Sequence, residues 1–453
     1  KKKRIFIDMT YLEAVSLMKE IESRYDLMQI KYKGVSVWPL LRINIVDAIS
    51  GNNETMKSTG GSAIKQVLST LFYYNPFDYF KKRSVWLFAG FERRKEVNGL
   101  KKLRVSGCVI DACENTLVIE KPGKDQSTTP RSMVPEKDVV SESWLLLFVH
   151  AYAILTKWKK IKIENECVLQ RVLKEYKIQF DYIGALRVLD AQKKVFDVLL
   201  AVIHKPGKVI IECPYTIMGY VWSLHKKAIP VIELQHGVLN DKHYAYNSLY
   251  TSPILYPDEI CVFGEDEYQF LTGDDSHYCK KVYKTGLYFM ELAQKSFTND
   301  IFREYRVKYE HIILVAGQRG YEEAMADYIR EAAKKTPKCL YVYVPRDIDA
   351  ELVFDQENVI YRPGINIYEY MIWCDVHLTI SSTTCLECQY YKKPTIFYNY
   401  AEMSENYYGK VLKAENGVVF TKSVSEYEQA LEKVLTTKFD YKEVFTGNTV
   451  KRI

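Results

Sequence analysis

From residue 209 onward, short apolar runs alternate with segments of helical periodicity, and this alternation restricts the fold more than any other feature. The runs are short and rich in β-branched and aromatic residues, which indicates strands buried on both faces. Strands that alternate with helices are typical of doubly wound parallel sheets. Strands are expected at 84–89, 116–120, 209–213, 230–234, 259–263, 282–285, 311–316, 339–344, 359–361, 376–380 and 395–398.

The chain is expected to form two such domains. Its 453 residues exceed what one core ordinarily organises. The strand pattern restarts at residue 311, after a polar segment (297–310) that is predicted to be helical. We therefore predict an N-terminal, acceptor-side domain of residues 1–296 with helical insertions, and a C-terminal, nucleotide-binding domain of residues 297–453. Because ligands bind at the carboxyl ends of parallel strands, the residues that follow each strand are the candidates for a site in the cleft between the domains.

Extra helices are predicted in the N-terminal domain. Helical periodicity dominates residues 5–50 and 141–203, whereas the polar stretch 51–61 is expected to be a loop. The run Trp144–Leu155 is about 12 residues long, and a membrane span needs roughly 20. It is expected to be either a buried helix or, since lysines follow it, a helix lying on a membrane surface.

Four consecutive hydroxyl residues follow the strand expected at 376–380: Ser381, Ser382, Thr383 and Thr384. Backbone N–H groups and hydroxyls in such a turn bind anions, so we predict that they contact the phosphates of a nucleotide. Glu387 follows in the next helix, where its carboxylate is placed to accept hydrogen bonds from ribose hydroxyls. Helix capping is the alternative for any single Ser or Thr, but four in succession favour phosphate binding.

A second polar cluster follows the strand expected at 230–234. His236 suits general base catalysis because imidazole titrates near neutral pH. Glu233 and Asp241 are the other candidates for the base or for a group that orients it. Gln235 and His243 are predicted to contact the acceptor.

Polar and charged residues after three other strands are weaker candidates for contacts with the ligands. Gln318 and Arg319 follow the first strand of the second domain, and Arg346 follows the next one; all three are predicted to face the donor. Arg93 and Arg94 follow the strand expected at 84–89 and are candidates for holding an anionic acceptor, with solvated surface charge as an equal alternative.

No metal or cofactor is predicted. The triplet Asp347-Ile348-Asp349 matches the D-x-D of metal-dependent transferases, but so short a pattern is common by chance. Cys385 and Cys388 have C-x-x-C spacing without a second pair, and the other cysteines are scattered singly, which indicates thiols in a reducing compartment. The residues after the basic start, Lys1–Arg4, do not form a signal sequence. A cytoplasmic protein is therefore expected, with possible contact at the inner face of the membrane.

The formal net charge of +6 is too small and too dispersed to indicate a nucleic-acid partner, but it is compatible with acidic substrates. With these residues in view, the chain resembles bacterial glycosyltransferases of surface-polysaccharide synthesis that have the two-domain GT-B architecture. The matching segments are Trp38-Pro39-Leu40-Leu41-Arg42, Glu92-Arg93-Arg94, Glu233-Leu234-Gln235-His236-Gly237, Cys261-Val262-Phe263-Gly264-Glu265, and Ser381–Thr384 with Glu387 and Lys393-Pro394.

The resemblance implies transfer of a sugar from a nucleotide-sugar to a glycan or lipid-linked glycan of the O-antigen, capsule or lipooligosaccharide type. One departure concerns the donor: relatives that use CMP-activated acidic sugars carry His-Pro where this chain has Val344-Pro345. Three alternatives stay open. They are a polyol-phosphate transferase of the teichoic-acid type, a nucleotide-sugar 2-epimerase, and a non-catalytic module with the same fold.

Overall fold

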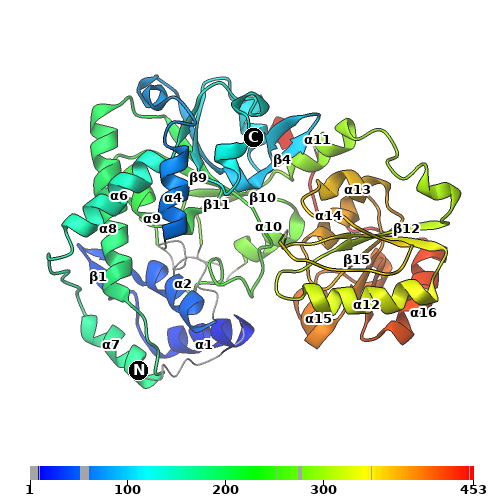
Figure 1. Ribbon diagram of the computed structural model, residues 1–453. Coiled ribbons are helices and arrows are strands. Elements are labelled where there is room, and N and C mark those ends of the chain that lie inside the picture. The colour runs from blue at the N-terminus through cyan, green and yellow to red at the C-terminus, as the bar shows by residue number, and fades with distance from the viewer. Residues whose placement is uncertain are drawn as a thin grey trace.

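The computed structural model describes residues 9, 11–50, 61–250, 252–273, 278–347, 349–447 and 449–452. It contains two parallel β-sheets, each flanked by helices, which form two domains lying side by side (Figure 1). The predicted α/β class with two doubly wound domains and extra N-terminal helices is confirmed. Residues 1–4, Ile348 and nearly all of the loop expected at 51–61 lie outside the described residues.

The first sheet has seven strands in the order β11-β10-β9-β8-β3-β6-β7, and every neighbouring pair is parallel. Its inner strand β3 is buried along most of its length because both faces are covered by helices. The strands are β3 (Val85–Gly90), β6 (Thr116–Lys121), β7 (Val139–Ser141), β8 (Lys208–Ile211), β9 (Val231–Leu234), β10 (Glu259–Val262) and β11 (Lys281–Lys284).

The second sheet has six parallel strands in the order β14-β13-β12-β15-β16-β17. Helices α12 (Glu322–Lys335) and α16 (Val424–Thr436) contribute to the core on one face of this sheet, and α13 (Ile367–Trp373) contributes to the core on the other. The strands are β12 (His311–Ala316), β13 (Cys339–Val344), β14 (Val359–Tyr361), β15 (Val376–Thr379), β16 (Thr395–Tyr398) and β17 (Val418–Thr421).

The N-terminal helices α1 (Tyr11–Arg24) and α2 (Trp38–Ile49) are joined to each other by a buried ion pair, and its arginine also binds the loop after β9. The guanidinium of Arg42 donates from Nε to Glu22 Oε1 over 2.7 Å, and both side chains are fully buried. Arg42 also donates to the carbonyl of Tyr244 and to Asn247 Oδ1, and both acceptors lie in the loop after β9. These helices therefore support the segment that follows His236.

Three further helices cover the first domain: α6 (Ser143–Leu155), α7 (Glu166–Glu175) and α8 (Tyr182–Val202). Helix α6 has one buried face, formed by Ser143, Leu145 and Val149, and an opposite face that is exposed. The part of the chain described here has no helix with the length and apolar character needed to cross a membrane.

The segment between the two sheets differs from the prediction for 297–310. In place of the expected helix there are turns and a short 3-10 helix at Tyr305–Val307. Arg306 explains the difference, because its guanidinium forms ion pairs with Asp300 and Asp375, and these tertiary contacts override a weak helical preference.

The boundary between 1–296 and 297–453 stays a prediction. The final segment of the second range returns to the first domain: the Thr446 amide donates to the Phe263 carbonyl, and α17 (Thr449–Arg452) packs on α5 (Gly107–Ala112).

Candidate active site

Each sheet has one position where the strand order reverses, and most of the predicted site residues follow a strand at or next to one of these two positions. In the first sheet the chain moves outward in opposite directions from β3 and β8, and in the second from β12 and β15. Crevices at the carboxyl ends of such strands are the usual ligand sites of doubly wound folds. Arg93 follows β3, His236 follows β9, Gln318 follows β12 and Ser381 follows β15.

His236 and Arg93 both carry buried nitrogen atoms without a hydrogen-bond partner. Within the described residues, neither Nδ1 of His236 nor Nη1 of Arg93 has a hydrogen-bond partner, whereas Nε2 of His236 lies 3.1 Å from the hydroxyl of Tyr215. The backbone of Glu212 also lies near the imidazole. Burial, followed by the nearby Arg93, lowers the pKa of His236 well below its ordinary value. The imidazole is therefore neutral at neutral pH, with one nitrogen free to act on a ligand.

The carboxylate next to Arg93 is Glu212, directly after β8. Its Oε2 lies 3.7 Å from Arg93 Nε, and its Oε1 accepts a hydrogen bond from the Ser106 hydroxyl over 2.6 Å. Glu212 is almost completely buried, so it orients Arg93 toward the same side as His236. Sequence reasoning did not find Glu212, although it occupies the end of a predicted strand.

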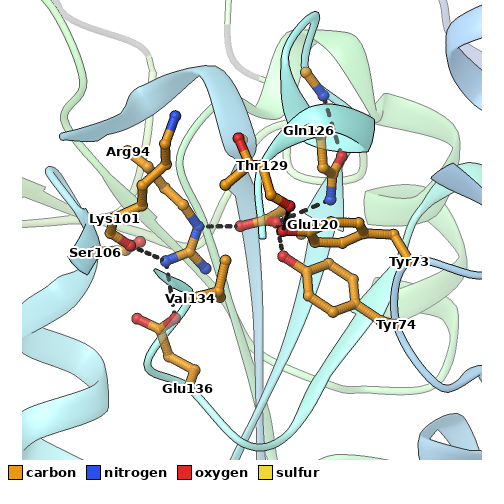
Figure 2. A network of polar contacts seen from close by, with 12 residues as sticks. Tyr73, Tyr74, Arg94, Lys101, Ser106, Glu120, Gln126, Thr129, Val134 and Glu136 are labelled. Atoms are coloured by element: carbon orange, nitrogen blue, oxygen red, sulfur yellow. Dashed lines mark hydrogen bonds and ion pairs between the residues drawn. The ribbon is translucent and has the colours of Figure 1, made fainter. Parts of the chain in front are cut away.

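Arg94 was predicted to hold an acceptor, and this prediction is wrong. Its side chain is buried in a polar network beneath the site (Figure 2), where Nε donates to Glu120 Oε1 over 2.6 Å. Nη1 donates to the Lys101 carbonyl over 2.7 Å and to Glu136 Oε2 over 2.8 Å. Because successive side chains of a strand point to opposite sides, Arg94 anchors the strand while its neighbour Lys95 points away from the core.

The strand that Arg94 begins belongs to a two-stranded hairpin, β4 (Arg94–Val97) and β5 (Leu100–Leu103), that the sequence analysis missed. Its turn is Asn98-Gly99, and both residues have positive φ, 51° and 75°. This dipeptide between apolar residues is a strong hairpin signal, because the tight turn requires positive φ at both positions.

The hairpin places two cations against the second domain. Arg104, directly after β5, donates from Nη2 to Glu387 Oε1 and from Nε to the Tyr368 hydroxyl, each over 2.5 Å. The Tyr368 hydroxyl also donates to Glu387 Oε1 over 2.7 Å. Glu387 thus contacts a residue of the first domain, but it is buried and Arg104 and Tyr368 occupy one of its oxygens, so its role in binding ribose stays a prediction.

Lys95 is the second of these cations. In the part of the chain that the structure describes, no hydrogen bond or ion pair engages its ammonium group. Burial, then the like charges of Arg104 and Arg346, lower the pKa of Lys95 to about 8. Arg346, predicted from its place after β13, therefore lies near Lys95 across the domain interface. Three cations gather here with Glu387 as the nearby carboxylate, and this favours an anionic ligand.

The hydroxyl turn after β15 is only partly available to a ligand. Ser381 and Ser382 are half-buried and Thr383 is exposed, and the Ser382 amide donates to Thr379 Oγ1 over 3.3 Å. The Thr384 hydroxyl instead lies 2.9 Å from Nε2 of the fully buried His377. The prediction that Thr384 contacts phosphate is therefore wrong, because its side chain holds the helix to the sheet.

The helix after this turn, α14 (Thr384–Tyr390), has seven residues. Its short dipole adds little electrostatic attraction. The positive charge of the site therefore comes chiefly from Lys95, Arg104 and Arg346.

Two predicted residues near His236 are structural. Glu233 is fully buried and accepts hydrogen bonds from the hydroxyls of Tyr246 and Tyr278 over 2.6 and 2.5 Å. Burial raises the pKa of Glu233 to about 8, so it is a protonated group within the core and cannot serve as the base. Gln235 donates to the Gly237 carbonyl over 2.8 Å and accepts from the Phe263 amide over 2.7 Å. It therefore fixes the turn before His236 and has no free group for an acceptor.

Four other candidate residues lie after strands β9 and β12, and their roles in binding stay predictions. Asp241 is exposed on the loop after β9, and burial lowers the pKa of His243 to about 4. Gln318 is half-buried and Arg319 is exposed beyond the end of β12. Across the described residues, no group of three or more His, Cys, Asp and Glu side chains is arranged to hold a metal ion.

Comparison with known proteins gives a fold but no family. No family model matches the chain, and no curated protein matches its sequence. Among solved structures, it is similar to the UDP-GlcNAc 2-epimerase of Methanocaldococcus jannaschii, at 10% identity and a TM-score of 0.50, over 81% of this chain and 97% of that one.

Two other solved structures are similar at lower scores. S. aureus MnaA, solved with UDP, has 11% identity and a TM-score of 0.49 over 82% of this chain and 94% of that one. The glycosyltransferase of kitacinnamycin has 12% identity and a TM-score of 0.49 over 81% and 92%. The arrangement of the two parallel sheets is of the GT-B type.

Proposed function

We propose that this protein is a glycosyltransferase that binds a nucleotide-sugar between its domains and transfers the sugar to a bacterial surface glycan or its lipid-linked precursor. The observation that supports the proposal most directly is the gathering of cations from both domains at the carboxyl ends of the strands. Lys95 and Arg104 come from the first domain and Arg346 from the second, while Ser381 and Ser382 follow strand β15 of the second sheet.

This arrangement suits the phosphates of a nucleotide. The bond that breaks in the transfer joins the sugar C1 to a phosphate oxygen, so negative charge grows on the departing nucleotide. Fixed cations in a partly buried site stabilise that charge more in the transition state than in the bound substrate. No metal or cofactor has a part in this proposal, because Lys95, Arg104 and Arg346 supply the positive charge that a metal would otherwise provide.

The acceptor would be activated by His236. A hydroxyl of the acceptor attacks C1 of the sugar, and its proton passes to the unpartnered Nδ1 of the neutral imidazole. Arg93, with its own unpartnered Nη1, would hold an anionic group of the acceptor or donor beside this nitrogen. Asp241 and His243 remain proposed acceptor contacts, since both lie on the following loop.

Glu387 would bind the ribose through the oxygen that Arg104 and Tyr368 leave free. Both of these residues donate to Oε1, and no described donor reaches Oε2. A ribose diol approaching Oε2 would meet a hydrogen-bond acceptor whose position the contacts with Arg104 and Tyr368 fix. Gln318 and Arg319 remain proposed contacts to the donor. Free thiols at all ten cysteines agree with the proposed cytoplasmic location.

A thermal-shift screen with CMP, UDP, GDP and CDP tests the donor site. One of these nucleotides is expected to raise the melting temperature, and Ser382→Ala combined with Glu387→Ala should weaken that effect. If no nucleotide stabilises the protein, a non-catalytic module is the better interpretation; if the double variant responds like the parent, the site assignment fails.

Incubation with nucleotide-sugars alone tests the reaction. An epimerase converts its substrate without an acceptor, whereas the proposed transferase releases nucleotide only when an acceptor glycan is added. Transfer of a polyol phosphate from a CDP-polyol would instead establish the teichoic-acid type of activity.

A further inference from the structure

Two helices of the first domain expose apolar side chains that meet in one continuous surface. On α4 (Gly61–Thr70), Ile64 and Leu68 are 42% and 52% exposed, and Phe72, two residues after the helix, is 75% exposed. The spacing of four residues places these side chains along the same side of a helix. Helix α6 lies at the side of the first domain remote from the second domain (Figure 1).

The exposed face of α6 continues this surface. Trp144 and Phe148 lie one turn apart with ring centroids 6.4 Å from each other, and Leu155 and Trp158 follow at 72% and 78% exposed. The two helices are joined where the Phe72 ring meets the Trp144 ring edge-on at 5.3 Å. We call this set the apolar face: Ile64, Leu68, Phe72, Trp144, Phe148, Ile154, Leu155 and Trp158.

The junction between the helices is rigid. The Trp144 indole donates from Nε1 to the Leu71 carbonyl over 2.9 Å, and the hydroxyls of Thr70 and Ser143 lie 2.7 Å apart in a buried position. The junction of the two helices is therefore held by packing and hydrogen bonds beneath the aromatic side chains, and Phe72 and Phe148 remain 75% and 54% exposed. Exposure of so many large apolar groups in one place carries a free-energy cost and marks an interaction surface.

Charge within the two segments that form the apolar face is of one sign. Residues 61–77 and 143–163 contain no aspartate or glutamate, but they carry five lysines: Lys65, Lys157, Lys159, Lys160 and Lys162. The ammonium of Lys159 lies 5.4 Å from the centre of the Trp158 ring, so the cation sits beside the most exposed aromatic side chain. A protein partner is less well matched, because lysine is depleted in protein interfaces.

We propose that the apolar face binds the surface of a membrane that contains anionic lipid. Its aromatic and aliphatic side chains would enter the boundary between headgroups and acyl chains, while the lysine ammonium groups pair with lipid phosphates. This surface is separate from the cleft, and the inference does not rest on the proposed glycosyltransferase activity. Of the two alternatives expected for the segment Trp144–Leu155, a buried helix or a helix lying on a membrane surface, the proposal favours the second.

Vesicle co-sedimentation of the full chain tests this inference. Binding is expected to vesicles of phosphatidylcholine mixed with phosphatidylglycerol, to weaken with added salt, and to be slight with phosphatidylcholine alone. Phe148→Ala combined with Trp158→Ala should lower the partition coefficient by about tenfold or more. Lys157→Gln, Lys159→Gln and Lys160→Gln should each lower it by about fivefold.

Val307→Ala is the matched control, because Val307 is 90% exposed but belongs to the segment between the sheets. It should bind vesicles like the parent. Circular dichroism and the thermal response to nucleotide should be unchanged in all variants, which separates this test from that of the cleft. Equal binding by the parent and the Phe148/Trp158 variant would overturn the proposal. So would a dimer in sedimentation velocity that this double variant abolishes, because the occupant would then be a second copy of the chain.

Discussion

Arg94 and Lys95 are adjacent in sequence, and replacing each with methionine should have opposite consequences. In Arg94→Met, the buried carboxylates of Glu120 and Glu136 lose their shared cation; the three side chains are 1%, 0% and 8% exposed. Removing one partner of a buried ion pair costs about 3–5 kcal/mol of unfolding free energy. Methionine keeps most of the side-chain volume, so the loss reports charge and hydrogen bonding.

Lys95→Met should leave the unfolding free energy unchanged or raise it, since no described residue pairs with the ammonium and Arg104 and Arg346 repel it. Affinity for the stabilising nucleotide should instead fall about 10- to 150-fold, because a hydrogen bond to a charged group contributes about 1.5–3 kcal/mol. In the parent, affinity should also decline as the pH rises through about 8, where Lys95 loses its proton.

The assay combines urea denaturation with nucleotide titration of both variants across pH 6.5 to 9 (about two and a half units around the Lys95 pKa). Lys95→Met should abolish the decline in affinity near pH 8. The assignment of Arg94 to the core and of Lys95 to nucleotide binding is refuted if Lys95→Met loses more stability than Arg94→Met, or if it binds nucleotide as tightly as the parent.

Three other outcomes are expected. His236→Ala should lower turnover by about 10²–10⁴-fold with donor affinity nearly unchanged, measured by nucleotide release in the presence of acceptor; unaltered turnover would remove His236 from the mechanism. Glu387→Gln should reduce nucleotide affinity and lower the melting temperature, because Arg104 then remains a largely buried cation without a counter-charge; a calorimetric scan matching the parent would contradict this. The pKa of Glu233 is raised to about 8 from 4.5, so its contribution to stability is present below about pH 4.5 and is lost as the pH rises toward 8. Glu233→Gln should flatten this pH dependence of the unfolding free energy in denaturation curves. If the variant shows the same pH dependence as the parent, another group is responsible.

The sequence was sufficient to predict eleven of the thirteen strands of the two large sheets, because those strands are local, apolar and regularly spaced; it missed the edge strands β7 and β17. Buried parallel strands read as apolar runs, and their carboxyl ends identified His236, Arg93 and Ser381 without knowledge of the strand order. The prediction of a helix at 297–310 was wrong, because Arg306 there forms ion pairs with Asp300 nearby in sequence and with the distant Asp375. Local periodicity contains no information about such tertiary ion pairs.

Within the candidate site, the direction in which a side chain points was the feature that the sequence could not predict. Arg93 and Arg94 are equivalent as residue types, and only the hairpin that turns at Asn98-Gly99 directs Arg94 inward onto Glu120. The contact of Arg104 with Glu387 joins residues 283 positions apart across two domains, so no spacing rule would reveal it.

Calorimetric titration of nucleotides is the most direct test of a nucleotide-sugar site between the domains. One of CMP, UDP, GDP and CDP is expected to bind the parent, and Lys95→Met combined with Arg104→Met should abolish that binding. The matched control is Lys308→Met, which removes only an exposed lysine paired with Glu357, and it should bind like the parent. Failure of all four nucleotides to bind the parent, or undiminished binding by the double variant, would contradict a nucleotide-sugar site between the domains.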